Sequence, residues 1–232
     1  MSVQERFYRR GFERWQGTGE PLDHGDPDHP SHRYHAAWRA IATTRFERAL
    51  EIGYGVGSPV DRICGGVGTL DIVDVVDISA AHALPTNCRA HIANLDDPFP
   101  FPDAHFDCAL AMMVVEHLYD PFAAFAELAR VLRPGAPAFV NLPNIASVKN
   151  RWLLLTGRMP VTSSVDWFEK REWDGNHLHY FTIADVRRLA EVSGLSLTAI
   201  HPVGRLTALK RLWPGLLCHE ITFTFVRRAG GE

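Results

Sequence analysis

Short apolar runs alternate with amphipathic stretches along most of the chain, which predicts alternating strands and helices. Runs of this kind, bounded by turn residues, are typical of buried strands. The predicted strands are Ala49–Ile52, Leu70–Val76, Cys88–Ile92, Phe106–Met112, Ala136–Asn141, Leu197–His201 and Glu220–Val226. The alternation indicates a mostly parallel sheet that is covered on both faces by helices. The linker before the last strand contains Pro and Gly, which is compatible with an antiparallel strand at one edge.

Helical spacing of apolar residues is clearest over Pro121–Leu132, which a Pro-Gly pair then ends. A later helix is predicted to begin after Thr182 and to run through Ala190. Thr182 is a suitable N-cap for it, with Asp185 three residues further along. Helix capping alone therefore explains Thr182 and Asp185, without a role for them in binding or catalysis.

Composition places the chain among ordinary globular proteins. It has 232 residues, 46% hydrophobic and 22% charged, which suits one domain. Its net charge of −3 disfavours nucleic-acid partners. The longest apolar run, Cys108–Val115, is too short to span a bilayer, and the N-terminus lacks the apolar stretch of a signal peptide. We therefore expect a cytoplasmic protein with no membrane partner, and a monomer or homodimer.

A glycine-rich turn follows the first predicted strand. Gly53, Gly55 and Gly57 leave backbone N–H groups available and allow a ligand close approach. The spacing is GxGxG, and therefore not the GxGxxG of dinucleotide-binding proteins. Asp77 lies 20 residues beyond Gly57, where a carboxylate can accept hydrogen bonds from both hydroxyls of a ribose. The alternatives on the same strand are Asp71 and Asp74.

Four segments in order carry a resemblance to a known family. They are ALEIGYGVGS, VVDIS, LDDPFPFPDAHFDCALAMMVVEHLYDP and ARVLRPGAPAFVNLPN, within Ala49–Asn144. This part of the chain resembles a class I S-adenosylmethionine-dependent methyltransferase of the small-molecule type. The resemblance implies a Rossmann-like α/β fold with a seven-stranded sheet whose last strand is antiparallel. It also implies S-adenosylmethionine as cofactor, with S-adenosylhomocysteine as product.

The resemblance assigns the cofactor contacts position by position. The matching residues are Glu51, Gly53, Gly55, Gly57, Asp77, Ile78, Asn94, Leu95 and Met113. In relatives, the residue matching Glu51 orders the glycine loop and the methionyl amino group. The residues matching Asp77 and Ile78 bind the ribose and pack on the adenine. Asn94 stands roughly where many relatives carry an adenine-binding Asp, with Asp96 as the alternative.

Methylation of a hydroxyl requires removal of a proton, and histidine is the side chain best suited to that task. His117, just after the fourth strand, and His177 are the candidate catalytic bases. The alternative for His117 is to hold the cofactor or its loop, and for His177 to be a buried, hydrogen-bonded core residue. A sugar or natural-product hydroxyl is the favoured acceptor. A small amine is the alternative acceptor. The alternatives to a methyltransferase are a non-catalytic cofactor-binding protein and a nicotinamide oxidoreductase.

Further acceptor contacts are expected from segments on either side of the core. The candidates are Tyr8, Tyr34, His35, Arg151 and His179. The resemblance narrows here to methyltransferases with an inserted helical cap. We divide the single domain into an N-terminal lid (1–44), a cofactor-binding core (45–144), a cap insertion (145–180) and a C-terminal part (181–232).

Histidine is unusually frequent between residues 24 and 35, where aspartates accompany it. Metal binding is one interpretation, and a polar lid over the cofactor is the other. The spacing matches no zinc site, so we favour the lid. His177 and His179 lie two residues apart without nearby acidic ligands in the expected spacing, and we expect no metal there either.

Overall fold

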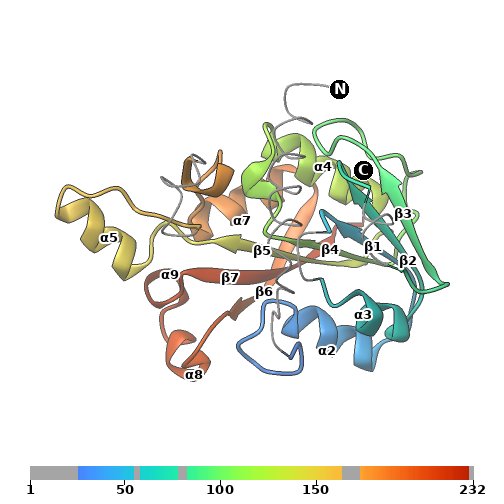
Figure 1. Ribbon diagram of the computed structural model, residues 1–232, viewed down its shortest axis with the longest axis horizontal. Coiled ribbons are helices and arrows are strands. Elements are labelled where there is room, and N and C mark those ends of the chain that lie inside the picture. The colour runs from blue at the N-terminus through green and yellow to red at the C-terminus, as the bar shows by residue number, and fades with distance from the viewer. Residues whose placement is uncertain (1–25, 55–57, 78–82, 164–172, 230–232) are drawn as a thin grey trace.

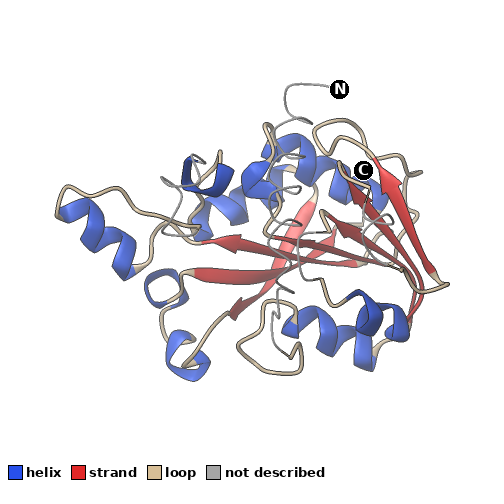
Figure 2. Ribbon diagram, in the orientation of Figure 1, coloured by secondary structure: helices blue, strands red, loops and turns tan. Residues whose placement is uncertain are grey.

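One seven-stranded sheet with helices on both faces organises the computed structural model (Figures 1 and 2), which describes residues 26–54, 58–77, 83–163 and 173–229. The strands are β1 (Phe46–Ile52), β2 (Val67–Asp74), β3 (Cys88–Ile92), β4 (Cys108–Met112), β5 (Pro137–Pro143), β6 (Leu195–Pro202) and β7 (Glu220–Arg227). Their order across the sheet is β3-β2-β1-β4-β5-β7-β6. β7 runs antiparallel to both of its neighbours, β5 and β6, while the other described strand pairs are parallel. The predicted fold class is confirmed.

Helices cover the two faces in pairs. The helices are α2 (His35–Thr43), α3 (Val60–Gly66), α4 (Pro121–Val131), α5 (Val148–Leu155), α7 (Ile183–Val192), α8 (Thr207–Lys210) and α9 (Pro214–Leu217), with short 3₁₀ turns η1 (Val115–His117) and η2 (Trp173–Asn176). Figure 1 shows α2 and α3 below the sheet and α4 and α7 above it. No described helix has the length and apolar run needed to cross a lipid bilayer.

The sheet separates two hydrophobic clusters. One joins α4 and α7 to the sheet through residues such as Phe125 and Leu189. The other joins α2 and α3 to the opposite face through Ile41 and Ile63. Phe125 is fully buried, and burial of one such side chain stabilises a fold by roughly 1.5–3 kcal/mol. The central strand β4 is apolar and buried along its whole length because both faces of the sheet are covered there, whereas the edge strand β3 is partly exposed.

Capping fixes where the main helices begin. The Asp120 carboxylate accepts hydrogen bonds from the first N–H groups of α4, and Pro121 follows it at the first helical position. Thr182 and Asp185 form the reciprocal capping box of α7, as the sequence predicts. The N-terminal segment that the sequence assigns to the lid lies outside the described residues up to position 25.

Most predicted strands differ from the structure by one to three residues at one or both ends, and two of these differences have a clear structural reason. β2 ends at Asp74, because its carboxylate accepts the N–H of Val76 and turns the chain away from the sheet. β4 begins at Cys108, since Phe106 instead forms an isolated bridge with Leu132. Neither difference changes the sheet order.

Strand order determines where a ligand can bind. β2 and β3 extend the sheet on one side of β1, while β4 and β5 extend it on the other side. Ligands of open α/β sheets bind outside the carboxyl ends of the strands at such a switch point. The glycine turn after β1, the loop after β2 and η1 after β4 all meet at this edge.

Candidate functional site

The first residue of the glycine turn must be a glycine in this fold. Gly53 has φ 69°, and its N–H donates to the Val73 carbonyl at 2.9 Å. A Cβ placed here would lie 2.6 Å from Val114 Cγ2, well inside van der Waals contact. The turn therefore presses directly on the loop that follows β4. Gly55 and Gly57 lie outside the described residues.

Glu51, the next-to-last residue of β1, holds both sides of this turn. Its buried carboxylate accepts a hydrogen bond from Tyr34 Oη at 2.6 Å and another from Ser58 Oγ at 2.7 Å. Burial raises the pKa of Glu51 to about 7, although both hydroxyl donors act to lower it. Tyr34, expected at the acceptor, is thus buried against the predicted cofactor-binding carboxylate.

The two alternative aspartates of β2 have structural partners. Asp74 accepts the Tyr54 N–H at 2.8 Å, which ties the end of β2 to the glycine turn. Asp71 lies 2.6 Å from His91 Nε2. Asp77 is exposed beyond the end of β2, where the ribose contact is expected. Ile78 lies outside the described residues.

The loop after β3 holds the predicted adenine-binding residues. Asn94 Oδ1 accepts the Asp96 N–H at 3.3 Å, and Asn94 Nδ2 donates to Asp97 at 3.2 Å. Asp96 Oδ1 accepts the Tyr119 N–H at 2.7 Å, so this loop is joined to the loop before α4. Both candidates, Asn94 and Asp96, therefore also stabilise the loops of the sheet edge.

The remaining two cofactor candidates, Leu95 and Met113, differ in exposure. Leu95 is buried in the core cluster, whereas Met113 is partly exposed. Met113 follows β4 with φ 57°, a left-handed conformation that is uncommon for a residue other than glycine. Its N–H donates to the Asn141 carbonyl at 3.0 Å. The chain turns sharply here and so places η1 at the edge of the sheet.

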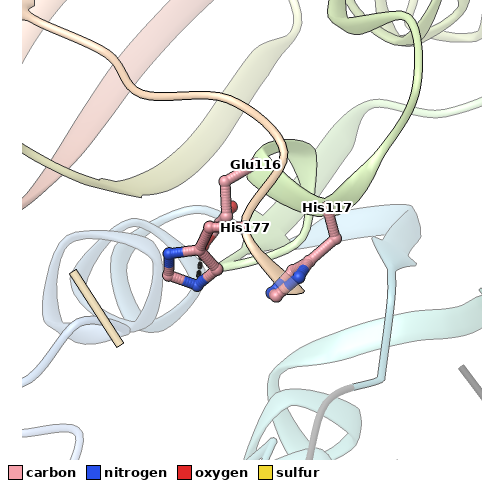
Figure 3. A group of neighbouring side chains, drawn as sticks. All are labelled: Glu116, His117 and His177. Carbon is pink, nitrogen blue, oxygen red and sulfur yellow. Dashed lines mark ion pairs between the residues drawn. The ribbon is translucent and has the colours of Figure 1, made fainter. Parts of the chain in front are cut away.

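Three side chains converge beside this turn: Glu116, His117 and His177 (Figure 3). We call them the Glu-His-His cluster. Each offers one potential ligand atom, and these atoms all lie within 4.8 Å of one another. Glu116 Oε1 lies 4.0 Å from His177 Nε2, and the two imidazole rings meet edge to face at 4.7 Å. Both predicted catalytic histidines therefore belong to one cluster.

A short relay of hydrogen bonds sets the orientation of His177. Its Nδ1 lies 2.7 Å from Thr162 Oγ1, and that hydroxyl donates its proton to Asp174 Oδ2 at 2.7 Å. Because the hydroxyl has a single proton, Nδ1 of His177 must be the donor to it. The Nε2 lone pair then points toward Glu116. Burial lowers the pKa of His177, which favours the neutral form of the imidazole.

His117 is held in the same tautomer by a backbone group. Its Nδ1 lies 3.2 Å from the Asn176 carbonyl, which can only accept a hydrogen bond. Burial, with a contribution from nearby His177, lowers the pKa of His117 to about 4. Both histidines are therefore neutral near pH 7, and each keeps its lone pair on Nε2.

Glu116 is the unusual member of the cluster. Its side chain is fully buried, and neither carboxylate oxygen has a hydrogen-bond partner among the described residues. Burial raises the pKa of Glu116 to about 8. Its backbone carbonyl accepts the N–H groups of Leu178 and His179 at 2.8 and 3.1 Å, which joins η1 to the segment carrying His177.

The other predicted acceptor contacts lie outside the Glu-His-His cluster. His179 Nε2 contacts the Tyr119 carbonyl at 3.1 Å, and His35 Nδ1 contacts the Pro27 carbonyl at 3.1 Å. Arg151 is exposed on α5, where its Nε donates to the Ala146 carbonyl at 2.7 Å. Tyr8 lies outside the described residues. Sequence reasoning did not identify Thr162, Asp174 or the Glu116 side chain.

In the described part of the histidine-rich loop, residues 26–35, no group of three metal-ligating side chains forms. Asp26 and Asp28 instead contact the Arg62 guanidinium on α3 at 2.7 and 3.5 Å. His29 Nδ1 lies 2.5 Å from Ser31 Oγ. These contacts join the described part of the loop to α3, and its interpretation as a lid over the cofactor stays a prediction.

A family model described as a methyltransferase domain matches residues 9–200. The chain is 32% identical over 140 residues to 27-O-demethylrifamycin SV methyltransferase from Amycolatopsis mediterranei, covering 50% of this chain and 49% of that protein. It is 25% identical over 132 residues to ubiquinone biosynthesis O-methyltransferase from Xanthomonas euvesicatoria, covering 53% of this chain and 55% of that protein. The chain thus spans about half the length of these curated relatives.

Solved structures share the fold. An S-adenosylmethionine-dependent methyltransferase from Mesorhizobium loti superposes with a TM-score of 0.64 at 16% identity, over 87% of this chain and 100% of that one. The 1,6-didemethyltoxoflavin-N1-methyltransferase of Burkholderia thailandensis, with bound S-adenosylhomocysteine, has a TM-score of 0.62 at 14% identity, over 98% and 88%. The family model covers most of the chain, and the buried Glu51 carboxylate beside the glycine turn is chemically suited to the ammonium group of such a cofactor. The chain therefore belongs to the class I S-adenosylmethionine-dependent methyltransferases, with S-adenosylmethionine as its cofactor.

Proposed function

We propose that this protein methylates a hydroxyl oxygen of a small molecule, with a sugar or natural product as the acceptor class. The observation that supports it is the Glu-His-His cluster, which lies at the same sheet edge as the glycine turn. A hydroxyl placed there would face two neutral imidazoles whose Nε2 atoms accept hydrogen bonds. Two relatives are named as acting on oxygen or on an O-demethylated compound.

Cofactor binding is assigned to the edge formed by β1, β2 and β3. We propose that Glu51 faces the methionyl ammonium, that Asp77 binds the ribose hydroxyls, and that Asn94 or Asp96 meets the adenine. When bound, the cofactor supplies an electrophilic methyl group on a sulfonium. The protein contributes by aligning the acceptor oxygen with that methyl group, which is mainly a proximity effect.

Removal of the acceptor's proton is the step that the cluster would assist. His177 is the better placed acceptor of a hydrogen bond, because Thr162 and Asp174 orient its Nε2. His117 has a pKa of about 4, so it is a weak base by itself. We propose that the histidines bind and orient the hydroxyl, and that a further electrostatic interaction stabilises the acceptor's anion as the proton leaves.

An amine acceptor is the second candidate within the class. The toxoflavin methyltransferase, which shares this fold, is named for methylation at nitrogen. A neutral amine attacks without prior loss of a proton, so methylation of an amine would continue after the histidines are replaced. A non-catalytic cofactor-binding protein is the other alternative, and it would bind the cofactor but methylate nothing.

The test combines binding with turnover. Calorimetry should show that S-adenosylhomocysteine binds while NAD does not. A panel of sugar, phenol and amine acceptors, read by formation of S-adenosylhomocysteine, should then give turnover on a hydroxyl. His177→Gln should lower that turnover at least tenfold, while His105→Gln, in the loop before β4, should not. Unchanged turnover in His177→Gln, or turnover on amines alone, would contradict hydroxyl activation at the cluster. Cytoplasmic location and a monomeric or homodimeric state remain predictions.

A further inference from the structure

We infer that Glu116, His117 and His177 bind a divalent transition-metal cation, and that the acceptor hydroxyl completes its coordination. This inference rests on the proposed function, because it concerns the same end of the site. A bound cation would stabilise the anion of the acceptor hydroxyl, which two neutral histidines do not do. The sequence predicted no metal, because its spacing pairs His177 with His179 and does not reveal that Glu116 lies beside His177.

The donor set is the first support. Two imidazole nitrogens and one carboxylate oxygen form a set found in catalytic zinc sites, where a fourth position stays open for substrate. The potential ligand atoms lie within 4.8 Å of one another, and one pair is 4.0 Å apart. Ligand atoms around a tetrahedral cation with bonds of about 2.1 Å are about 3.4 Å apart. Side-chain movements of about one ångström would therefore close the site.

Orientation of the histidines is the second support. Histidines that bind metals almost always donate their other ring N–H to a carboxylate, a backbone carbonyl or water. His117 Nδ1 meets the Asn176 carbonyl, and His177 Nδ1 meets the Thr162 hydroxyl, which Asp174 holds in turn. Both rings thus present Nε2 as the ligand atom.

The environment of Glu116 is the third and most specific support. A buried carboxylate is costly unless it is paired or hydrogen-bonded. Glu116 has neither carboxylate oxygen hydrogen-bonded among the described residues, and it is fully buried beside His177. The Glu116 backbone is nevertheless tightly fixed, because its carbonyl accepts two N–H groups from the segment that carries His177. A cation would pair this carboxylate without any change of backbone.

Such a cation accounts for proton removal with a complete balance. Coordination lowers the pKa of a bound oxygen acid by stabilising its anion. The acceptor O–H bond breaks, and its proton passes to solvent water. The new O–C bond forms as the S–C bond of the sulfonium breaks, which gives a methyl ether, S-adenosylhomocysteine and one proton. No oxidant or reductant is involved.

Cobalt(II) is a suitable probe, because its visible absorption reports bound imidazole and carboxylate ligands. The full chain, without an affinity tag and treated with a chelator, would be titrated with Co²⁺ in the presence of S-adenosylhomocysteine. We expect one saturable Co²⁺ site whose spectrum disappears on addition of Zn²⁺. Glu116→Gln and His177→Gln should each weaken Co²⁺ binding at least tenfold.

Matched controls separate this site from other histidines. His179→Gln removes a neighbouring imidazole outside the cluster, and His29→Gln removes one from the histidine-rich loop. Both should bind Co²⁺ like the unaltered protein. Binding of S-adenosylhomocysteine by each variant shows that it is folded.

The results distinguish the two proposals. If S-adenosylhomocysteine binds but Co²⁺ does not, or if all variants bind Co²⁺ equally, the cation inference is wrong and the proposed function stands. If Co²⁺ binds at the cluster but no hydroxyl compound is methylated, the cation site stands and the proposed function fails. With a working acceptor, turnover should fall at least tenfold after chelation and return with the metal.

Discussion

Replacing Glu51 by glutamine should change folding stability and cofactor affinity in opposite directions. The pKa of Glu51 is about 7 in the folded chain and 4.5 as the reference for the unfolded chain, because burial disfavours the anion. Between these values the folded state binds more protons, so stability falls as pH rises. Integrating over pH 5 to 8 gives a loss of about 2.5 kcal/mol, which the Glu51→Gln variant would not show.

Urea unfolding at pH 5, 6.5 and 8, without cofactor, measures this effect. The free energy of unfolding of Glu51→Gln minus that of the unaltered protein should rise by about 2.5 kcal/mol across the range. Taking this difference cancels other groups such as Glu116. Tyr34→Phe, which removes a hydroxyl that lowers the pKa of Glu51, should make the loss at high pH larger.

Calorimetry at pH 8 then measures affinity. Loss of a charge-assisted hydrogen bond to the methionyl ammonium should weaken S-adenosylhomocysteine binding at least tenfold, from a free energy of roughly 1.5–3 kcal/mol. Parallel stability curves for the two proteins would refute the raised pKa. Unchanged affinity would refute the assigned contact between Glu51 and the cofactor.

Three further substitutions address other parts of the site and fold. Gly53→Ala adds a Cβ at 2.6 Å from Val114 and should lower the free energy of unfolding in urea by about 2–4 kcal/mol. Adding Val114→Ala should recover part of that loss, and no recovery would mean that the positive φ alone is responsible. Asp77→Ala should lower S-adenosylhomocysteine affinity at least tenfold, while Glu47→Ala, near the opposite end of β1, should leave affinity unchanged. Equal effects of the two substitutions would remove Asp77 from the ribose site. Thr182→Ala should lower thermal stability by about 1 kcal/mol, measured by calorimetric scanning, and an unchanged midpoint would show that the capping box contributes nothing.

The central strands β4 and β5 were predictable because helices cover both faces of the sheet, so each appears as a nearly continuous apolar run. All seven predicted strands are present, and Thr182 caps its helix as expected. The end of β2 was not predictable from the apolar run. It depends on the Asp74 carboxylate, which accepts backbone N–H groups of Val76 and of distant Tyr54.

The candidate site was predictable only where its residues lie close together in sequence. The glycine turn and Glu51 follow from a local pattern after β1. Glu116 and His177 are far apart along the chain and meet only because η1 and the segment after η2 share backbone hydrogen bonds. Sequence spacing therefore grouped His177 with His179, while the fold groups it with Glu116 and His117.

The position of β7 has a consequence for how the chain is made. Although β7 is the last strand along the described chain, it lies inside the sheet, between β5 and β6. Until Glu220–Arg227 leaves the ribosome, β5 presents an unpaired edge and β6 has no strand to join. Unpaired edges are templates for aggregation, and pairing between distant segments is slow. We expect chains that stop short of β7 to depend on chaperones or to aggregate, even though nearly all of the catalytic edge has already been synthesised.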